Sequence, residues 1–117
     1  MTKKIYFLQT CDTCKRILKE INTEGFYSQE IKTKPITVSQ LEEMYRLSSS
    51  YEALFNKRAK LYKAMDLKNK LLSEEDYKQY ILEEYTFLKR PVFVIGDSIY
   101  IGNSKKVVDE VKKKIDA

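Results

Sequence analysis

Apolar residues recur with two different periods along the 117-residue chain, and the changes of period divide it into predicted elements. A short apolar run at residues 3–9 predicts a buried strand, and residues 26–32 predict a second strand. Between them, four residues share the i, i+3, i+4, i+7 spacing of one buried helix face: Cys14, Ile17, Leu18 and Ile21. Gly25 ends this helical segment, so the first part of the chain is predicted to be strand, helix, strand.

Residues 35–85 carry helical patterns and no strand pattern. Thr37 and Gln40 have the spacing of a capping box, and the apolar residues that follow predict a short helix. The serines at 48–50 predict a break and a cap for a second helix, and Ser73 with three acidic residues after it predicts another that runs to about residue 84. The pattern at 61–71 is ambiguous, and we predict a further short helix there.

Strand patterns return at residues 91–95 and 98–101, and Gly96-Asp97 between them predicts a tight hairpin. Four apolar residues then predict a final amphipathic helix: Val107, Val108, Val111 and Ile115. The predicted order is β-α-β-(helices)-β-β-α, an α/β (α+β) arrangement with a mixed sheet. We expect one domain over residues 1–117, with 1–34 and 86–117 as the core and 35–85 as an inserted helical subdomain.

Composition narrows the class of protein. Apolar residues make up 43% and charged residues 33% of the chain, which is typical of a globular domain. We see no signal-peptide pattern and no long apolar run, so we expect a cytoplasmic protein without a membrane span. The net charge is +5, but the lysines are spread along the chain among acidic residues. This distribution favours a solvated lysine-rich surface over direct nucleic-acid binding.

The only two cysteines, Cys11 and Cys14, form a CxxC pair in a chain without histidine. A zinc site needs three or four protein ligands, so this chain would have to add carboxylates or a second chain, and we expect no metal. A disulfide that closes two intervening residues constrains the unfolded chain little, which argues against a structural crosslink. Redox or nucleophilic chemistry is the favoured interpretation, and a pair of buried, unreactive thiols is the alternative.

Within the pair, Cys11 is predicted to lie in the turn before the helix and Cys14 on its inward face. Free backbone N–H groups at a helix start favour an anion, and Lys15 and Arg16 add positive charge, whereas Asp12 opposes the effect. These groups should lower the thiol pKa from ~8.5 toward the range of ~3.5 to 7.5 of reactive cysteines. We therefore predict Cys11 as the nucleophile and Cys14 as the resolving thiol.

The predicted order, with CxxC after the first strand, resembles the thioredoxin/glutaredoxin fold with a helical insertion. More specifically, the whole chain resembles the arsenate reductase-like family, which includes glutathione-dependent arsenate reductases and Spx-type redox regulators. The resemblance rests on residues 11–16 (CDTCKR), 56–62 (NKRAKLY), 88–92 (LKRPV) and the pair Ile101-Gly102.

The resemblance implies roles for residues far from the CxxC pair. Pro91 would be the cis-proline that lies against the nucleophilic cysteine. Arg90 would then lie close to Cys11, where it would stabilise the thiolate and bind an oxyanion. Arg58, in the insertion, would be a second oxyanion contact. Glutathione-dependent arsenate reductases carry arginines at two positions where, in our alignment, this chain has Asn56 and Gly102, so of their three arginines only Arg90 matches in place.

As a function, the resemblance implies a monomeric arsenate reductase-like thiol–disulfide oxidoreductase. It would bind no cofactor and would use glutathione with glutaredoxin, or thioredoxin, as its reductant. The alternative is a redox-sensing regulator of the Spx type that binds the RNA polymerase α-subunit. Arg58 and residues 89–91 resemble the corresponding residues of those regulators. However, the regulators carry a glycine at the polymerase-contacting turn, where this chain has Ser50. A third option is a redox-active CxxC protein without a dedicated oxyanion substrate.

Overall fold

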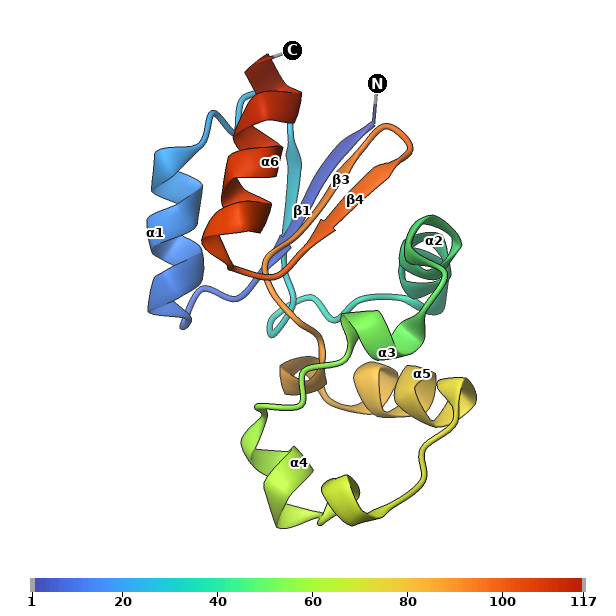
Figure 1. Ribbon diagram of the computed structural model, residues 1–117. Helices are drawn as coiled ribbons and strands as arrows, with labels where there is room; N and C mark the ends of the chain where they lie inside the picture. The colour runs from blue at the N-terminus through green and yellow to red at the C-terminus, as the bar shows by residue number, and fades with distance from the viewer. Residues whose placement is uncertain (1, 117) are drawn as a thin grey trace. The chain divides into compact units, whose positions relative to one another are not determined.

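The computed structural model describes residues 2–116, and its contacts divide the chain into two compact units (Figure 1). The first unit joins the chain up to Lys34 to the chain from Arg90 onward, and the second runs from Pro35 to Lys89. The predicted order of elements and the α/β fold class are confirmed. Within residues 2–116, no helix has the length and apolar character needed to span a membrane.

The first unit is built on a mixed four-stranded sheet in the order β2-β1-β3-β4. Its strands are β1 (Lys3–Phe7), β2 (Tyr27–Glu30), β3 (Val92–Ile95) and β4 (Ser98–Ile101). β1 runs parallel to β2 and antiparallel to β3, which forms a hairpin with β4. β1 ends at Phe7, two residues before the predicted end, because the backbone turns between Leu8 and Cys11.

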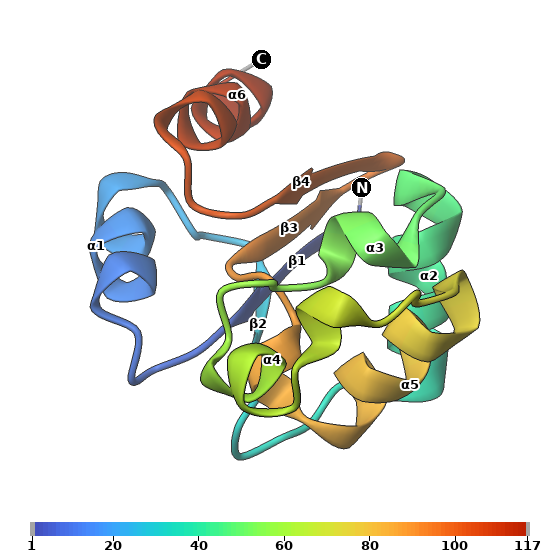
Figure 2. The same cartoon turned by 60° about the horizontal axis from the view of Figure 1, so that its bottom comes forward.

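Two helices of the first unit, α1 (Asp12–Glu20) and α6 (Lys105–Asp116), cover one face of this sheet (Figures 1 and 2). Ile5 of β1 lies directly opposite Phe93 of β3, so both side chains are on the same face. The core on this side comprises Ile5, Ile17, Ile21, Phe93, Ile95, Val108 and Val111. The apolar stripes predicted for both helices thus supply this core.

The second unit is helical. Its helices are α2 (Val38–Ser48), α3 (Tyr51–Leu54), α4 (Lys60–Ala64) and α5 (Glu74–Glu83), with 3-10 turns η1 (Leu67–Asn69) and η2 (Tyr85–Phe87). The predicted capping box of Thr37 and Gln40 is formed, and Ser73 forms a second box with Asp76. Ser50 caps α3 by accepting a hydrogen bond from the N–H of Ala53, at 3.0 Å. These caps set where the helices begin.

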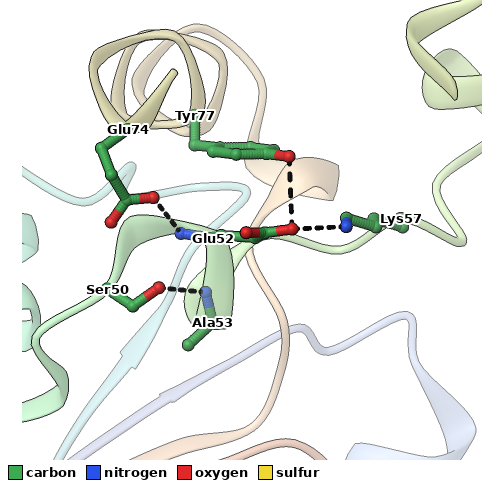
Figure 3. Close-up of polar contacts among 6 residues, drawn as sticks. All are labelled: Ser50, Glu52, Ala53, Lys57, Glu74 and Tyr77. Carbon is green, nitrogen blue, oxygen red and sulfur yellow. Dashed lines mark hydrogen bonds and ion pairs between the residues drawn. The ribbon is translucent and has the colours of Figure 1, made fainter. Parts of the chain in front are cut away.

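Side chains of α5 hold the very short helix α3 (Figure 3). The Glu74 carboxylate accepts the backbone N–H group of Tyr51 at 2.8 Å. It also accepts that of Glu52 at 3.1 Å, the contact drawn in Figure 3. The Glu52 carboxylate in turn contacts Lys57 Nζ at 2.6 Å and the Tyr77 hydroxyl at 3.4 Å. A helix of four residues is too short to be stable alone, so contacts of this kind stabilise it.

An aromatic cluster around Phe55 forms the core of the second unit. Phe55 is buried and stacks on Phe87 with ring centroids 5.0 Å apart, and Tyr77 lies 4.9 Å away. The backbone beyond η2 pairs with the same region, since the Lys89 N–H donates to the Leu54 carbonyl at 2.8 Å. The second unit therefore extends to Lys89, whereas the sequence pattern placed the end of the insertion at residue 85.

The ambiguous segment at residues 61–71 does not form one helix. It divides into α4 and the 3-10 turn η1, with Asp66 between them in the left-handed region at φ 54°. Leu67 is buried, whereas Leu61 is 39% and Leu71 101% exposed. The apolar residues of this segment therefore do not share one buried face, which is why their spacing was ambiguous.

The contrast between Phe55 and Leu71 predicts two different effects on stability. Phe55→Ala should lower the free energy of unfolding by about 3–5 kcal/mol, because it leaves a cavity among packed rings. Leu71→Ala should change it by no more than about 0.5 kcal/mol, because that side chain is solvent-exposed. Urea denaturation followed by circular dichroism measures both, and equal losses would contradict this packing.

Candidate redox site at the start of helix α1

Cys11 lies where the turn after β1 meets helix α1. Its N–H donates to the Leu8 carbonyl at 3.1 Å and closes the turn, and its own carbonyl accepts the N–H of Lys15 at 3.1 Å. Its backbone is extended, at φ −93° and ψ 110°, and Cys11 is the N-cap residue of α1. The side chain is partly exposed. A reagent can therefore reach the sulfur at the positive end of the helix.

Cys14 lies one turn further into α1, and the structure buries its side chain completely. It belongs to the inward face of the helix, as its spacing with Ile17 predicted. Both cysteines are free thiols in the structure. One sulfur of the pair is thus accessible, while the other is shielded from solvent.

The surroundings favour the thiolate form of Cys11. Burial is the largest single influence and opposes ionisation, but four groups together outweigh it: the backbone N–H and the thiol of Cys14, the Arg90 guanidinium and the Thr13 N–H. Together they hold the pKa of Cys11 below its ordinary value. The Cys11 side chain makes no cap hydrogen bond as a thiol. The N–H groups at the start of α1 therefore influence Cys11 by favouring its thiolate.

The surroundings of Cys14 have the opposite effect. The pKa of Cys14 is raised to about 12, mainly by burial and in part by the hydrogen bond and the charge of the Cys11 side chain. The Leu8 backbone N–H and Arg90 lower it, but less strongly. At neutral pH the pair therefore consists of a thiolate-prone Cys11 and a protonated Cys14.

Arg90 and Pro91 come directly before β3. The Arg90–Pro91 peptide bond is cis, as the family resemblance implied, and Pro91 is buried. The Arg90 charge favours the thiolate of both cysteines, which brings this predicted residue into the same electrostatic site as Cys11. The Pro91 carbonyl accepts the N–H of Gly102 at 2.9 Å, so the end of β4 holds the start of β3.

Lys15 and Arg58 are less directly connected with the thiols. The Lys15 side chain is exposed on α1, and the stronger contributions to the Cys11 pKa come from Cys14, Arg90 and Thr13. Arg58 belongs to the second unit, where it lies exposed in the turn before α4 with its N–H donating to Asn56 Oδ1 at 3.0 Å. The oxyanion contact assigned to Arg58 therefore stays a prediction.

Asn56 and Gly102, the two positions where the resemblance implies an arginine, have structural roles here. Asn56 Nδ2 donates to the Thr86 carbonyl at 3.2 Å, and its Oδ1 accepts the Arg58 N–H, so its amide links two segments of the second unit. Gly102 has φ 98°, a conformation that a residue with a Cβ adopts only under strain. An arginine at either position would lose these local features.

Sequence reasoning missed the part played by Leu8. Its carbonyl closes the turn to Cys11, and its N–H favours the Cys14 thiolate. Both are backbone groups, so no residue type signals them in the sequence. Among residues 2–116, no group of three or more Cys, Asp or Glu side chains is placed to hold a metal ion.

A cis-proline before β3, a partly exposed thiol at the N-cap of α1 and a mixed β2-β1-β3-β4 sheet define a thioredoxin-like thiol protein. The sequence profile of the ArsC family matches residues 6–111. The chain therefore belongs to the ArsC family, which supports a thiol-based, reductase-like function at family level. A search of curated proteins found no match.

Solved structures share the fold over nearly their whole length. An ArsC family related protein from Bacteroides fragilis is similar with a TM-score of 0.80 and 23% identity, over 96% of this chain and 98% of that one. The arsenate reductase from Vibrio cholerae gives 0.78 and 20%, over 95% and 98%. A Staphylococcus aureus protein solved by NMR gives 0.75 and 26%, over 93% and 97%.

The electrostatics of the pair predict a specific pH profile of alkylation. The rate at which iodoacetamide modifies Cys11 should reach half its maximum at a lower pH than in the urea-unfolded protein, because the folded state favours the thiolate. Arg90→Gln should move this midpoint to higher pH, since it removes a positive charge. Cys14 should stay unmodified at neutral pH.

Arg46→Gln is the matched control for Arg90→Gln, because Arg46 is an exposed arginine of α2 and is not among the groups that account for the shift of the Cys11 pKa. It should leave the midpoint unchanged within about 0.2 units, as screened surface charges have small effects. Mass spectrometry of the modified peptide separates the two cysteines. Equal shifts in both arginine variants would show that Arg90 contributes only general surface charge.

Proposed function

We propose that this protein is a thiol–disulfide oxidoreductase in which Cys11 is the nucleophile and Cys14 the resolving thiol. The observation that carries the proposal is the opposite direction of the two pKa shifts within one CxxC pair. A lowered pKa supplies the attacking thiolate, and a raised pKa keeps the second thiol protonated until it is needed. Partial exposure of Cys11 and burial of Cys14 agree with this division.

In the first step, the Cys11 thiolate attacks one sulfur of a disulfide substrate. A bond forms between Cys11 Sγ and that sulfur, the substrate S–S bond breaks, and the other half leaves as a thiolate that takes a proton from solvent. Arg90 and the N-terminus of α1 favour the negative charge on Cys11 before the attack. The product is a mixed disulfide at Cys11.

In the second step, Cys14 gives its proton to solvent and attacks Cys11 Sγ, which forms a Cys11–Cys14 disulfide. The bond to the substrate sulfur breaks, and the expelled substrate thiolate takes up a proton from solvent. Part of the raised pKa of Cys14 comes from the Cys11 side chain. Once Cys11 is a neutral mixed disulfide, its negative charge no longer opposes the ionisation of Cys14. Formation of the mixed disulfide thus activates the resolving thiol. Two electrons from glutathione with glutaredoxin, or from thioredoxin, then restore both thiols.

The disulfide substrate is favoured over arsenate by the two arginine departures. An oxyanion with several charged oxygens is best bound by planar guanidinium groups. At the two positions concerned, the Asn56 amide bonds within the second unit and Gly102 has a backbone conformation unsuited to arginine. Arg90 and, by family resemblance, Arg58 are the remaining oxyanion contacts. The similar structure from Vibrio cholerae is that of an arsenate reductase, so arsenate is the second substrate to test.

The deciding experiment follows NADPH oxidation with a low-molecular-weight disulfide and, in parallel, with arsenate. Each substrate is coupled to glutathione with glutaredoxin and to thioredoxin with its reductase. Cys11→Ser should reduce turnover to background with every substrate, because it removes the nucleophile. Cys14→Ser should instead accumulate a mixed disulfide at Cys11, detected by its added mass.

Turnover of arsenate that depends on Cys11 and exceeds disulfide turnover would replace the proposed substrate. No turnover with either substrate, while mild oxidant still forms the Cys11–Cys14 disulfide, would argue against an enzyme. The Spx-type alternative would then be tested by binding to the isolated C-terminal domain of the RNA polymerase α-subunit. An oxidoreductase should show no such binding.

A further inference from the structure

Glu30, the last residue of β2, collects backbone N–H groups from two separate segments of the first unit. Its Oε2 accepts the N–H of Gln9 at 2.8 Å. Its Oε1 accepts the N–H of Lys32 at 2.9 Å and, from Thr33, both the N–H at 2.8 Å and the hydroxyl at 3.1 Å. One carboxylate therefore joins the loop after β2 to the loop after β1.

The sheet brings Glu30 to this place. Glu30 pairs with Phe7 in the parallel register of β1 and β2, and the N–H of the next residue, Ile31, donates to the Phe7 carbonyl at 2.9 Å. The two strands thus end side by side. The Glu30 side chain begins level with the last residue of β1 and extends to Gln9, two residues further along that chain.

Gln9 is a central residue of the turn that presents Cys11. The turn starts at Leu8 and closes where the Cys11 N–H donates to the Leu8 carbonyl. The bond from Glu30 anchors this turn to β2 from outside. Leu8 also provides the N–H that favours the Cys14 thiolate, so a displacement of the turn would alter the surroundings of both thiols.

We propose that Glu30 is a positioning residue for the redox pair, acting through the Gln9 N–H to fix the turn from which Cys11 enters helix α1. This role rests on the proposed function, in which Cys11 is the reacting thiol. Glu30 acts through the backbone, and Cys11 is held against the N-terminus of α1 and the charge of Arg90. The effect of Glu30 is geometric: it holds Cys11 where these contacts can favour the thiolate, because preorganised contacts are effective only when the reacting atom is held in place.

A positioning role and a simple charge effect predict shifts of opposite sign. If Glu30 acted only as a negative charge, its neutralisation would favour the Cys11 thiolate and lower the pKa of Cys11. If Glu30 positions the turn, its loss weakens the N–H and Arg90 contributions that favour the thiolate, and the pKa of Cys11 rises. A role in folding stability alone would leave this pKa unchanged in the folded variant.

Glu30→Gln is the informative substitution. Glutamine keeps the length of the side chain and one acceptor oxygen. Its NH₂ group, however, would face N–H donors, either that of Gln9 or those of Lys32 and Thr33. We expect the midpoint of Cys11 alkylation to move up by about 0.5 to 1 pH units. Because one unit of pKa is a tenfold change in thiolate, alkylation below the midpoint should slow by about three- to tenfold.

Gln9→Pro provides a second, independent test, because it removes the N–H that Glu30 accepts while keeping the negative charge of Glu30. Gln9 has no positive φ, and proline is favoured at the first central position of such turns. The upward shift of the Cys11 midpoint should appear here too. Glu24→Gln is the matched control, an exposed glutamate in the loop before β2, and should cause no shift.

The readout is alkylation of Cys11 by iodoacetamide as a function of pH, in full-length variants whose circular dichroism matches that of the parent. An upward shift in Glu30→Gln and in Gln9→Pro, without one in Glu24→Gln, supports the proposal. A downward shift or no shift in either folded variant overturns it. The assay uses no substrate, so failure of the proposed oxidoreductase function is distinguished separately, by disulfide turnover that is absent or that survives in Cys11→Ser.

Discussion

The end of strand β1 is the constraint on which the candidate site depends. β1 lies between a parallel neighbour, β2, and an antiparallel neighbour, β3. Pairing on both sides fixes β1 up to Tyr6, and pairing with β2 fixes Phe7, the last strand residue. This leaves the chain only a short turn before helix α1 begins. Because the turn is closed by the Leu8 carbonyl and held by Glu30, Cys11 has one place available, at the N-cap of the helix.

From this placement the two thiols acquire different chemistry although they are only one helical turn apart. Cys11, at the end of the helix, meets the N–H groups of Thr13 and Cys14 and the charge of Arg90, whereas Cys14 is buried beneath it. Each cysteine is also part of the other's environment, because the Cys14 thiol favours the Cys11 thiolate and the Cys11 charge opposes ionisation of Cys14. The order of reactivity is thus a property of the pair.

The second unit has its own core and its own polar contacts, and Asn56, where the family resemblance implies an arginine, takes part in those contacts. The Asn56 amide bonds the Thr86 carbonyl and the Arg58 N–H, which hold the turn before α4. In the first unit, Gly102 adopts φ 98° and donates to the Pro91 carbonyl. The same two departures that weaken the case for arsenate therefore contribute to local structure.

Much of the fold could be predicted because its signals are local. The stripe of Cys14 and Ile17 identified α1, and the spacing of Thr37 and Gln40 identified the start of α2. For residues 61–71 the predicted short helix is present as α4, and the 3-10 turn η1 follows it. The pattern there was ambiguous because apolar side chains such as Leu71 stay exposed. The end of β1 was placed too late, because the turn at Leu8 depends on partners outside the segment.

By itself the sequence determined which residues could carry redox chemistry, since Cys11 and Cys14 are the only cysteines and no histidine competes with them. It also determined the order of the elements, because hydrophobic periods and caps act over a few residues. Only the tertiary structure decided how each thiol ionises and what holds it. Arg90 is distant from Cys11 in the chain, and Glu30 is 21 residues from Gln9. Charges and hydrogen bonds between such residues exist only after the strands have paired.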